Sequence, residues 1–328
     1  MIKTSNKSSV LNLRKFFSEY YAVVAIVILI IVFSFTSQYF LKYDNLKNIL
    51  IQTAPVSICA IGQAFCIIKG GMDLSLGQNL CVTSCTVAIL LKAGMNPWLA
   101  IIIGLVLGVA IGSGVGFLHS IIGLPTFIAS LAFQNICRGA AKIITQATPI
   151  SGFPREIDYF GKEYIGPIPI CVIIMVVFYM IFAFISRRTR FGRILYAIGG
   201  NKEAAFFAGI DVKKYTMFAH MLAGGLAAFA GLITMSRLSS VAITSGNLYE
   251  FDATTACAIG GIALSGGKGK LIYALLGILF LQVFFNGMVM LNVDSFWQEV
   301  LKGIVLAVSV SFDVLRGKKA AVKKKVNA

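Results

Sequence analysis

Residues 271–293 read LIYALLGILFLQVFFNGMVMLNV and contain no charged side chain. A run of about 20 apolar residues is long enough for one helix to cross a hydrocarbon core about 30 Å thick. A helix on the surface of a soluble domain would carry a polar stripe along one side, and this stretch carries none. The stretch therefore predicts a membrane-spanning helix.

Comparable runs without Asp, Glu, Lys or Arg occur along most of the chain. Only 13% of the 328 residues are charged, compared with about 25% in an ordinary soluble domain. We predict an all-α polytopic membrane protein with about ten transmembrane helices, in which Lys302 interrupts the last helix and snorkels to the nearer surface. The other runs are 21–41, 48–68, 74–91, 93–137 (long enough for two spans), 164–186 and 215–236, with weaker segments at 253–267 and 300–312.

The net charge of +16 is distributed unevenly between alternate connecting segments. If the N-terminus is placed inside, most Lys and Arg residues fall on the inner segments, and the outer segments are nearly balanced. This asymmetry predicts that both termini are cytoplasmic. It does not resemble a nucleic-acid-binding surface, which would be one basic face with interleaved aromatic residues. The predicted organisation is a cytoplasmic segment at 1–19, a transmembrane domain at 20–315 with an inner loop at 187–214, and a basic cytoplasmic tail at 316–328.

The inner loop has the clearest local signals. Gly199 and Gly200 are expected to break the chain, Asn201 to cap a helix, and residues 202–208 to form that short helix. A short helix between two spans suits docking into a groove on a partner protein. The alternative is a solvated basic loop with no partner.

Four segments resemble the permeases of ribose, xylose and galactose-type ABC importers, within the branched-chain amino acid and sugar permease superfamily. They are RFGR at 190–193 with AIGGN at 197–201 and EAA at 203–205; GGMDLS at 70–75; GLPTFIASL at 123–131; and EFDA at 250–253 with LSGGKG at 264–269. They occur in the expected order from about residue 60 to residue 270. Ala263 and Phe251 depart from the residues most common in that family.

The resemblance implies a type II importer fold and a permease subunit that carries a ribose-like monosaccharide across the bacterial inner membrane. It implies that the partners are a second permease copy or paralogue, two cytoplasmic ABC ATPase domains, an extracytoplasmic solute-binding protein and the surrounding lipid bilayer. It also implies that the inner loop couples to the ATPases. The coupling residues would be Arg190, Gly192, Arg193, Gly199, Gly200, Asn201, Glu203, Ala204, Ala205 and Gly209.

The LSGG sequence at 264–267 also spells the signature of ABC ATPase subunits, but no Walker A loop accompanies it. We therefore expect a turn that closes a span, no cofactor on this chain, and ATP with Mg on the partner subunit. The chain also lacks a metal-spaced His and Cys set, a nucleophile elbow and paired intramembrane carboxylates. An enzyme is therefore not expected, and the catalytic and metal sites are predicted to be absent.

Polar residues inside apolar runs are costly, and they usually face a bundle interior or an aqueous route. The candidates for the translocation path are Gln63, Asn135, Gln282 and Asn286, and the last two lie one helical turn apart. Hydrogen bonding between helices is the alternative for each, and it is the favoured one. Asp73 is expected to cap the following helix, and His220 alone provides no proton relay.

Two rival functions remain open at this point. A permease for branched-chain amino acids or nucleosides would share the fold. An ion-coupled secondary transporter would need an ionisable or carbonyl-rich site at the membrane midplane, for which the spans show no convincing candidate.

Overall fold

The computed structural model describes residues 22–326, and the predicted cytoplasmic segment 1–19 lies outside this range. The described chain is a bundle of helices, and six of them are long and apolar enough to cross a membrane. These are α2 (Tyr43–Ile68), α4 (Pro97–Ser120), α7 (Ile170–Arg188), α10 (Val212–Leu238), α12 (Leu271–Met290) and the Ser295–Phe312 part of α13 (Ser295–Val326). The bundle also contains the helices Ala22–Thr36, α3 (Leu76–Lys92), α5 (Thr126–Thr145) and the shorter α11 (Tyr249–Gly260).

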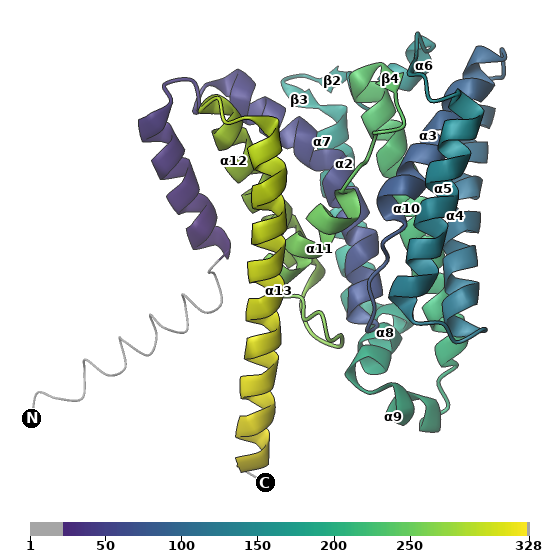
Figure 1. Ribbon diagram of the computed structural model, residues 1–328, viewed down its shortest axis with the longest axis vertical. Helices are drawn as coiled ribbons and strands as arrows, with labels where there is room; N and C mark the ends of the chain where they lie inside the picture. The colour runs from purple at the N-terminus through teal and green to yellow at the C-terminus, as the bar shows by residue number, and fades with distance from the viewer. Residues whose placement is uncertain (1–21, 327–328) are drawn as a thin grey trace, which may run out of the picture.

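Helices α2 and α10 form the centre of the bundle (Figure 1). Both are largely enclosed by other helices, whereas α13 lies at the edge with its apolar side chains outward. Helix α10 packs along α4 on one side and along α2 on the other. The centre is therefore built from helices that touch protein on most sides, which explains why their sequences tolerate polar residues.

Glycines allow α4 and α10 to approach each other closely. A methyl group added at Gly112 would overlap the carbonyl oxygen of His220, and one added at Gly108 would overlap Ala228. Gly224 on α10 meets α4 in the same way. Small residues at such spacing permit backbone contact between membrane helices. The glycines of α4 therefore serve helix packing.

The weak span predicted at 253–267 is wrong in extent. Helix α11 has 12 residues and is about 18 Å long at 1.5 Å per residue, so it is too short to cross a bilayer. It ends at Gly261, whose positive φ of 85° suits a residue without a side chain. Residues 264–267 then form part of the turn into α12, as expected for the LSGG sequence.

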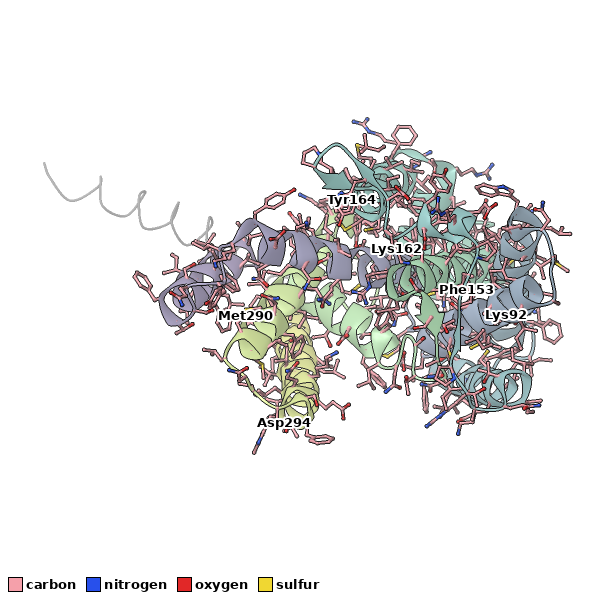
Figure 2. All side chains as sticks on the ribbon, turned by 90° about the horizontal axis from the view of Figure 1, so that it is seen from above. Lys92, Phe153, Lys162, Tyr164, Met290 and Asp294 are labelled. Atoms are coloured by element: carbon pink, nitrogen blue, oxygen red, sulfur yellow. The ribbon has the colours of Figure 1, made fainter. Side chains whose placement is uncertain are left out.

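The two ends of the bundle differ. One end carries the short pairings of β1 (Ile150–Ser151) with β4 (Ser240–Val241) and of β2 (Tyr164–Ile165) with β3 (Ile168–Pro169), next to α6 (Arg155–Asp158). Figure 2 looks onto this end, where Lys92, Lys162 and Met290 lie. The opposite end carries α8 (Arg190–Gly200) and α9 (Lys202–Phe207) (Figure 1). We call these the outer end and the inner end, following the predicted orientation.

Of the predicted tail at 316–328, residues up to Val326 continue α13 as a helix, and residues 327–328 lie outside the described range.

Candidate functional site

The inner end is built around α8, an amphipathic helix. Thr189 caps it, because its hydroxyl accepts a hydrogen bond from the Gly192 amide at 3.3 Å. Ile194, Leu195 and Ile198 are buried against the bundle. The exposed face is formed by Arg190, Arg193, Ala197 and Gly200. A helix with one apolar and one basic, glycine-ended face lies flat on the bundle and presents its charges outward.

Helix α9 follows after a single extended residue, Asn201, whose side chain accepts a hydrogen bond from the Ala204 amide at 3.0 Å. The predicted cap is confirmed, and the helix predicted at 202–208 is found at Lys202–Phe207. The predicted break at Gly199 and Gly200 is wrong by one residue. Both glycines are helical, and the chain turns at Asn201 because its side chain satisfies the start of α9.

The two alanines among the predicted coupling residues have different environments. Ala204 is exposed, but Ala205 is 5% exposed and packs against Ile194, Ile198 and Val212. Glu203 and Gly209 are exposed, and Gly209 has a positive φ of 78° in the turn toward α10. The outward apolar groups of α9 are instead Phe206 and Phe207, at 65% and 85% exposed. Sequence reasoning missed this pair, although its place at the end of a polar helix was a signal for it.

A cavity of about 920 Å³ opens beside these two phenylalanines. It lies between the end of α4, helix α9 and the start of α10. Its polar lining includes His119, Lys202, Glu203 and Asp211. The inner end therefore combines a protruding aromatic pair with an adjacent hollow.

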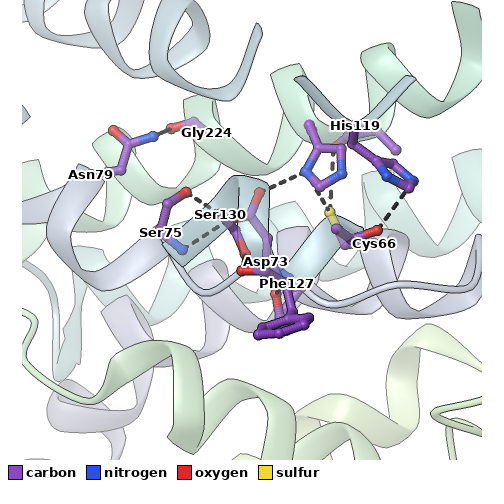
Figure 3. A network of polar contacts seen from close by, with 12 residues as sticks. Cys66, Asp73, Ser75, Asn79, His119, Phe127, Ser130 and Gly224 are labelled. Atoms are coloured by element: carbon purple, nitrogen blue, oxygen red, sulfur yellow. Dashed lines mark hydrogen bonds and ion pairs between the residues drawn. The ribbon is translucent and has the colours of Figure 1, made fainter. Parts of the chain in front are cut away.

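A buried polar network connects the centre of the bundle (Figure 3). His220 on α10 is 2.6 Å from Asp73 (Nδ1 to Oδ2), and neither side chain is accessible. The other carboxylate oxygen of Asp73 accepts hydrogen bonds from the amide and hydroxyl of Ser75, at 2.9 and 2.6 Å. Asp73 thus turns the chain toward α3 and ties the α2–α3 loop to α10. The predicted cap at Asp73 is wrong, because Ser75 occupies the N-cap position of α3 and Asp73 bonds to Ser75 instead of to a helix amide. His220 was expected to have no ionisable partner, but the structure places Asp73 against it.

The same network extends to α11. The amide nitrogen of Asp73 donates to Oε1 of Gln63 at 3.2 Å, and Nε2 of Gln63 donates to the hydroxyl of Thr254 at 2.7 Å. Gln63 is fully buried. Gln63 therefore joins the α2–α3 loop to α11 by hydrogen bonds. Hydrogen bonding of this kind was the favoured alternative to a role in the translocation path.

Cys66 lies next to the pair, and its sulfur with Asp73 and His220 brings three potential metal-ligand atoms within 4.8 Å of one another. Both carboxylate oxygens of Asp73 are already engaged, one by Ser75 and the other by His220. We interpret the group as a hydrogen-bonded connection between the loop and α10.

A second cavity, of about 270 Å³, lies at the outer end between α2, α10, α11, α12 and α13. Both Gln282 and Asn286 line it, as their common helix face predicted. Further amide groups come from Asn48, Gln52 and Gln298, and aromatic rings from Tyr249 and Phe285.

Asn286 and Asn45 form a reciprocal pair, each amide nitrogen lying 2.9 Å from the oxygen of the other. Asn286 thus both lines the cavity and joins α12 to α2. Asn135 is exposed on α5 and donates to the Leu131 carbonyl of its own helix at 3.1 Å. The structure therefore brings Gln282 and Asn286 together, and it leaves Gln63 and Asn135 elsewhere.

Lys302 and Asp252 form an ion pair at 2.9 Å on the wall of this cavity. The expectation that Lys302 snorkels to the surface is wrong, because the nearly buried carboxylate of α11 lies within reach of it. The charge distribution alone assigns Glu250 and Asp252 to an outer connecting segment, and the structure contradicts this assignment. Both are buried side chains in the first turn of α11.

The chain matches the family model described as branched-chain amino acid transport system / permease component over residues 45–310. It is 39% identical over 288 residues to the ribose import permease protein RbsC of Bacillus subtilis (strain 168), which covers 87% of this chain and 89% of that protein. It is 36% identical to RbsC of Escherichia coli (strain K12), over 90% of this chain and 93% of that protein. It is 34% identical to the D-allose transport system permease protein AlsC of Escherichia coli (strain K12), over 94% of this chain and 95% of that protein. No solved structure was found to match the chain.

Proposed function

The chain belongs to the branched-chain amino acid transport system permease family and is a multi-pass membrane protein, and from this premise we propose that it is the permease subunit of an ATP-driven importer for a ribose-like monosaccharide. Its relatives are named as ribose and allose permeases. The observation that carries the proposal is the pair of short helices α8 and α9 at one end of a bundle whose other end holds an amide-lined cavity. A permease of this kind is a transport component and not an enzyme.

The outer cavity supports a sugar as the solute. Amide groups match sugar hydroxyls because each offers both a donor and an acceptor. Five amide side chains line the cavity, together with the rings of Tyr249 and Phe285. A site for a branched aliphatic side chain would be mainly apolar, since a polar group left unpaired by its ligand costs free energy. We therefore assign Gln282 and Asn286 to the entrance of the translocation path.

The inner end supports coupling to an ATPase. Large aromatic side chains dominate binding energy at protein interfaces, and Phe206 and Phe207 protrude from a helix that is capped at Asn201. We propose that these two rings dock on the ATPase, together with the basic face of Arg190 and Arg193. Closure of the ATPases upon ATP binding would then move α9 and shift the bundle between outward-open and inward-open populations.

The remaining features of the proposal concern assembly. The subunit pairs with a second copy or a paralogue, receives sugar from an extracytoplasmic binding protein and lies in the bacterial inner membrane. ATP and Mg are held by the partner. The type II arrangement has about ten membrane-embedded helices with α11 as a short, half-span member, and both termini are cytoplasmic.

The proposal is tested by reconstituting the permease with a partner ABC ATPase and a solute-binding protein. We expect ATP-dependent uptake of ribose into proteoliposomes and none of leucine. Leucine uptake without ribose uptake would favour the amino acid permease instead.

The docking role is tested by Phe206→Ala with Phe207→Ala. Loss of interface aromatic anchors of this kind costs about 2 kcal/mol or more, so we expect affinity for the ATPase to fall at least about 30-fold. Phe296→Ala is the matched control, because Phe296 is 76% exposed but lies in the first turn of α13 at the outer end. Equal ATPase binding by the double variant and the control would refute the assignment.

A further inference from the structure

Three segments that lie far apart in the sequence meet at the inner end through backbone alone. They are Gly199 at the end of α8, Gly70 after α2, and the Gly266–Gly267 turn between α11 and α12. The Gly267 amide donates a hydrogen bond to the Ile68 carbonyl at 2.8 Å. A methyl group added at Gly199 would overlap the Ile68 carbonyl oxygen and lie 2.6 Å from the Gly267 nitrogen. We call this contact the glycine junction.

Gly199 has no freedom to become larger without separating these segments. The atoms it meets are backbone atoms, which cannot rotate away as a side chain can. The neighbouring Gly200 is different, because a methyl group there would meet nothing within 4 Å. Position 199 therefore requires a residue without a side chain, whereas position 200 has room for one.

A side chain fixes the same contact from α8. The hydroxyl of Tyr196, one turn before Gly200, donates to the Gly269 carbonyl at 2.8 Å. Burial raises the pKa of this phenol, although Ser186 and Arg187 lower it, so the hydroxyl keeps its proton and remains a donor. Tyr196 therefore attaches α8 to the α11–α12 turn next to the glycine junction.

Each segment held at the junction leads to a functional part of the bundle. From Gly70 the chain reaches Asp73 and its contact with His220 within three residues. Backward from Gly266 the chain enters α11, whose first turn carries Asp252 on the wall of the outer cavity. A displacement of α8 would therefore act both on the loop that carries Asp73 and on α11, which borders the outer cavity.

We propose that Tyr196 and Gly199 are positioning residues that transmit movement of α9 to the α2–α3 loop and to α11. This inference rests on the proposed function, since it assumes that α9 is moved by an ATPase. It goes beyond docking, because neither residue needs to touch the ATPase. Loss of the connection would leave ATP hydrolysis running without equivalent movement of the bundle.

The test compares Tyr196→Phe and Gly199→Ala with Tyr215→Phe and Gly139→Ala in the reconstituted importer. Gly139 lies within α5, and a methyl group there would meet nothing within 4 Å. Tyr215 packs its ring against Phe191, so its substitution removes a phenol from the same inner region as a control. The measured quantity is sugar imported per ATP hydrolysed, with ATPase affinity and thermal midpoint recorded for each variant. One hydrogen bond between neutral groups shifts an equilibrium roughly 2- to 10-fold, so we expect Tyr196→Phe to lower this ratio by a similar factor at unchanged ATPase binding.

We expect Gly199→Ala to lower the ratio at least as much, and both controls to match the wild type. If Gly199→Ala fails to fold, Tyr196→Phe decides the matter alone, because it removes one oxygen atom and no packing volume. A wild-type ratio in Tyr196→Phe would overturn the proposal. A wild type that imports no sugar with ATP would overturn the proposed function itself. Weak ATPase binding confined to the Phe206→Ala with Phe207→Ala variant would bear on docking and leave the role of Tyr196 and Gly199 to the import ratio.

Discussion

The contact between Asp73 and His220 provides a direct test of how the bundle is held together. Both side chains are inaccessible, and their atoms lie 2.6 Å apart. Removing one member of a buried pair typically costs about 3–5 kcal/mol, because the other member is left buried without its partner. Asp73→Ala also leaves the amide and hydroxyl of Ser75 without their acceptor. We therefore expect Asp73→Ala to lower the free energy of unfolding by about 3 kcal/mol or more.

Asp73→Asn is expected to be milder. The amide oxygen can still accept from Ser75, and the amide nitrogen can donate to His220 if the imidazole changes tautomer. The expected loss is about 1 kcal/mol, the size of one ordinary hydrogen bond. The double variant Asp73→Ala with His220→Ala should lose about 2 kcal/mol less than the sum of its single variants, because the second substitution removes a group that the first had already orphaned.

These values are measured by denaturant unfolding of the purified permease in detergent, followed by circular dichroism. The matched control is Asp44→Ala, since Asp44 also pairs with a base, Lys47, at 3.1 Å but its side chain is 88% exposed. Exposed pairs contribute about 1 kcal/mol or less. A coupling energy below about 0.5 kcal/mol for the buried pair, within the usual error of additivity, would refute the reasoning.

Two further predictions concern the outer end. Asn45→Ala and Asn286→Ala should each destabilise the permease by about 1 kcal/mol, because each removes an interhelical hydrogen bond in the membrane. Sugar uptake should fall further in Asn286→Ala, because only Asn286 lines the cavity. Equal uptake in the two variants would place Asn286 outside the path. Lys302→Met should reduce the amount of folded protein in membranes, since Asp252 is left without its counter-ion, and adding Asp252→Asn should restore much of it. A double variant that accumulates no better than Lys302→Met would contradict the ion-pair assignment.

The sequence was most informative where the physical signal is local. Absence of charge over about 20 residues identified the apolar helices, and Asn201 was recognised as a cap because its side chain satisfies an amide only three residues ahead. Such signals need no knowledge of distant partners.

Most of the errors involve partners that are distant in the sequence. The role of Lys302 depends on Asp252, and that of His220 depends on Asp73, which lies 147 positions away. Gly199 was assigned to a chain break, but its small size serves contact with Ile68 and Gly267. The short extent of α11 follows from Gly261 and from neighbours that bury its acids, and no single helix pattern contains that information.

Helix α11 also has a consequence for how the protein is made. A 12-residue segment with buried Glu250 and Asp252 in its first turn is a poor substrate for autonomous membrane insertion, because a spanning helix needs about 20 predominantly apolar residues. Its counter-ion Lys302 belongs to α13, which emerges from the ribosome later. We therefore expect α11 to reach its final place only when α13 joins the bundle, so that its assembly depends on a helix made later in synthesis.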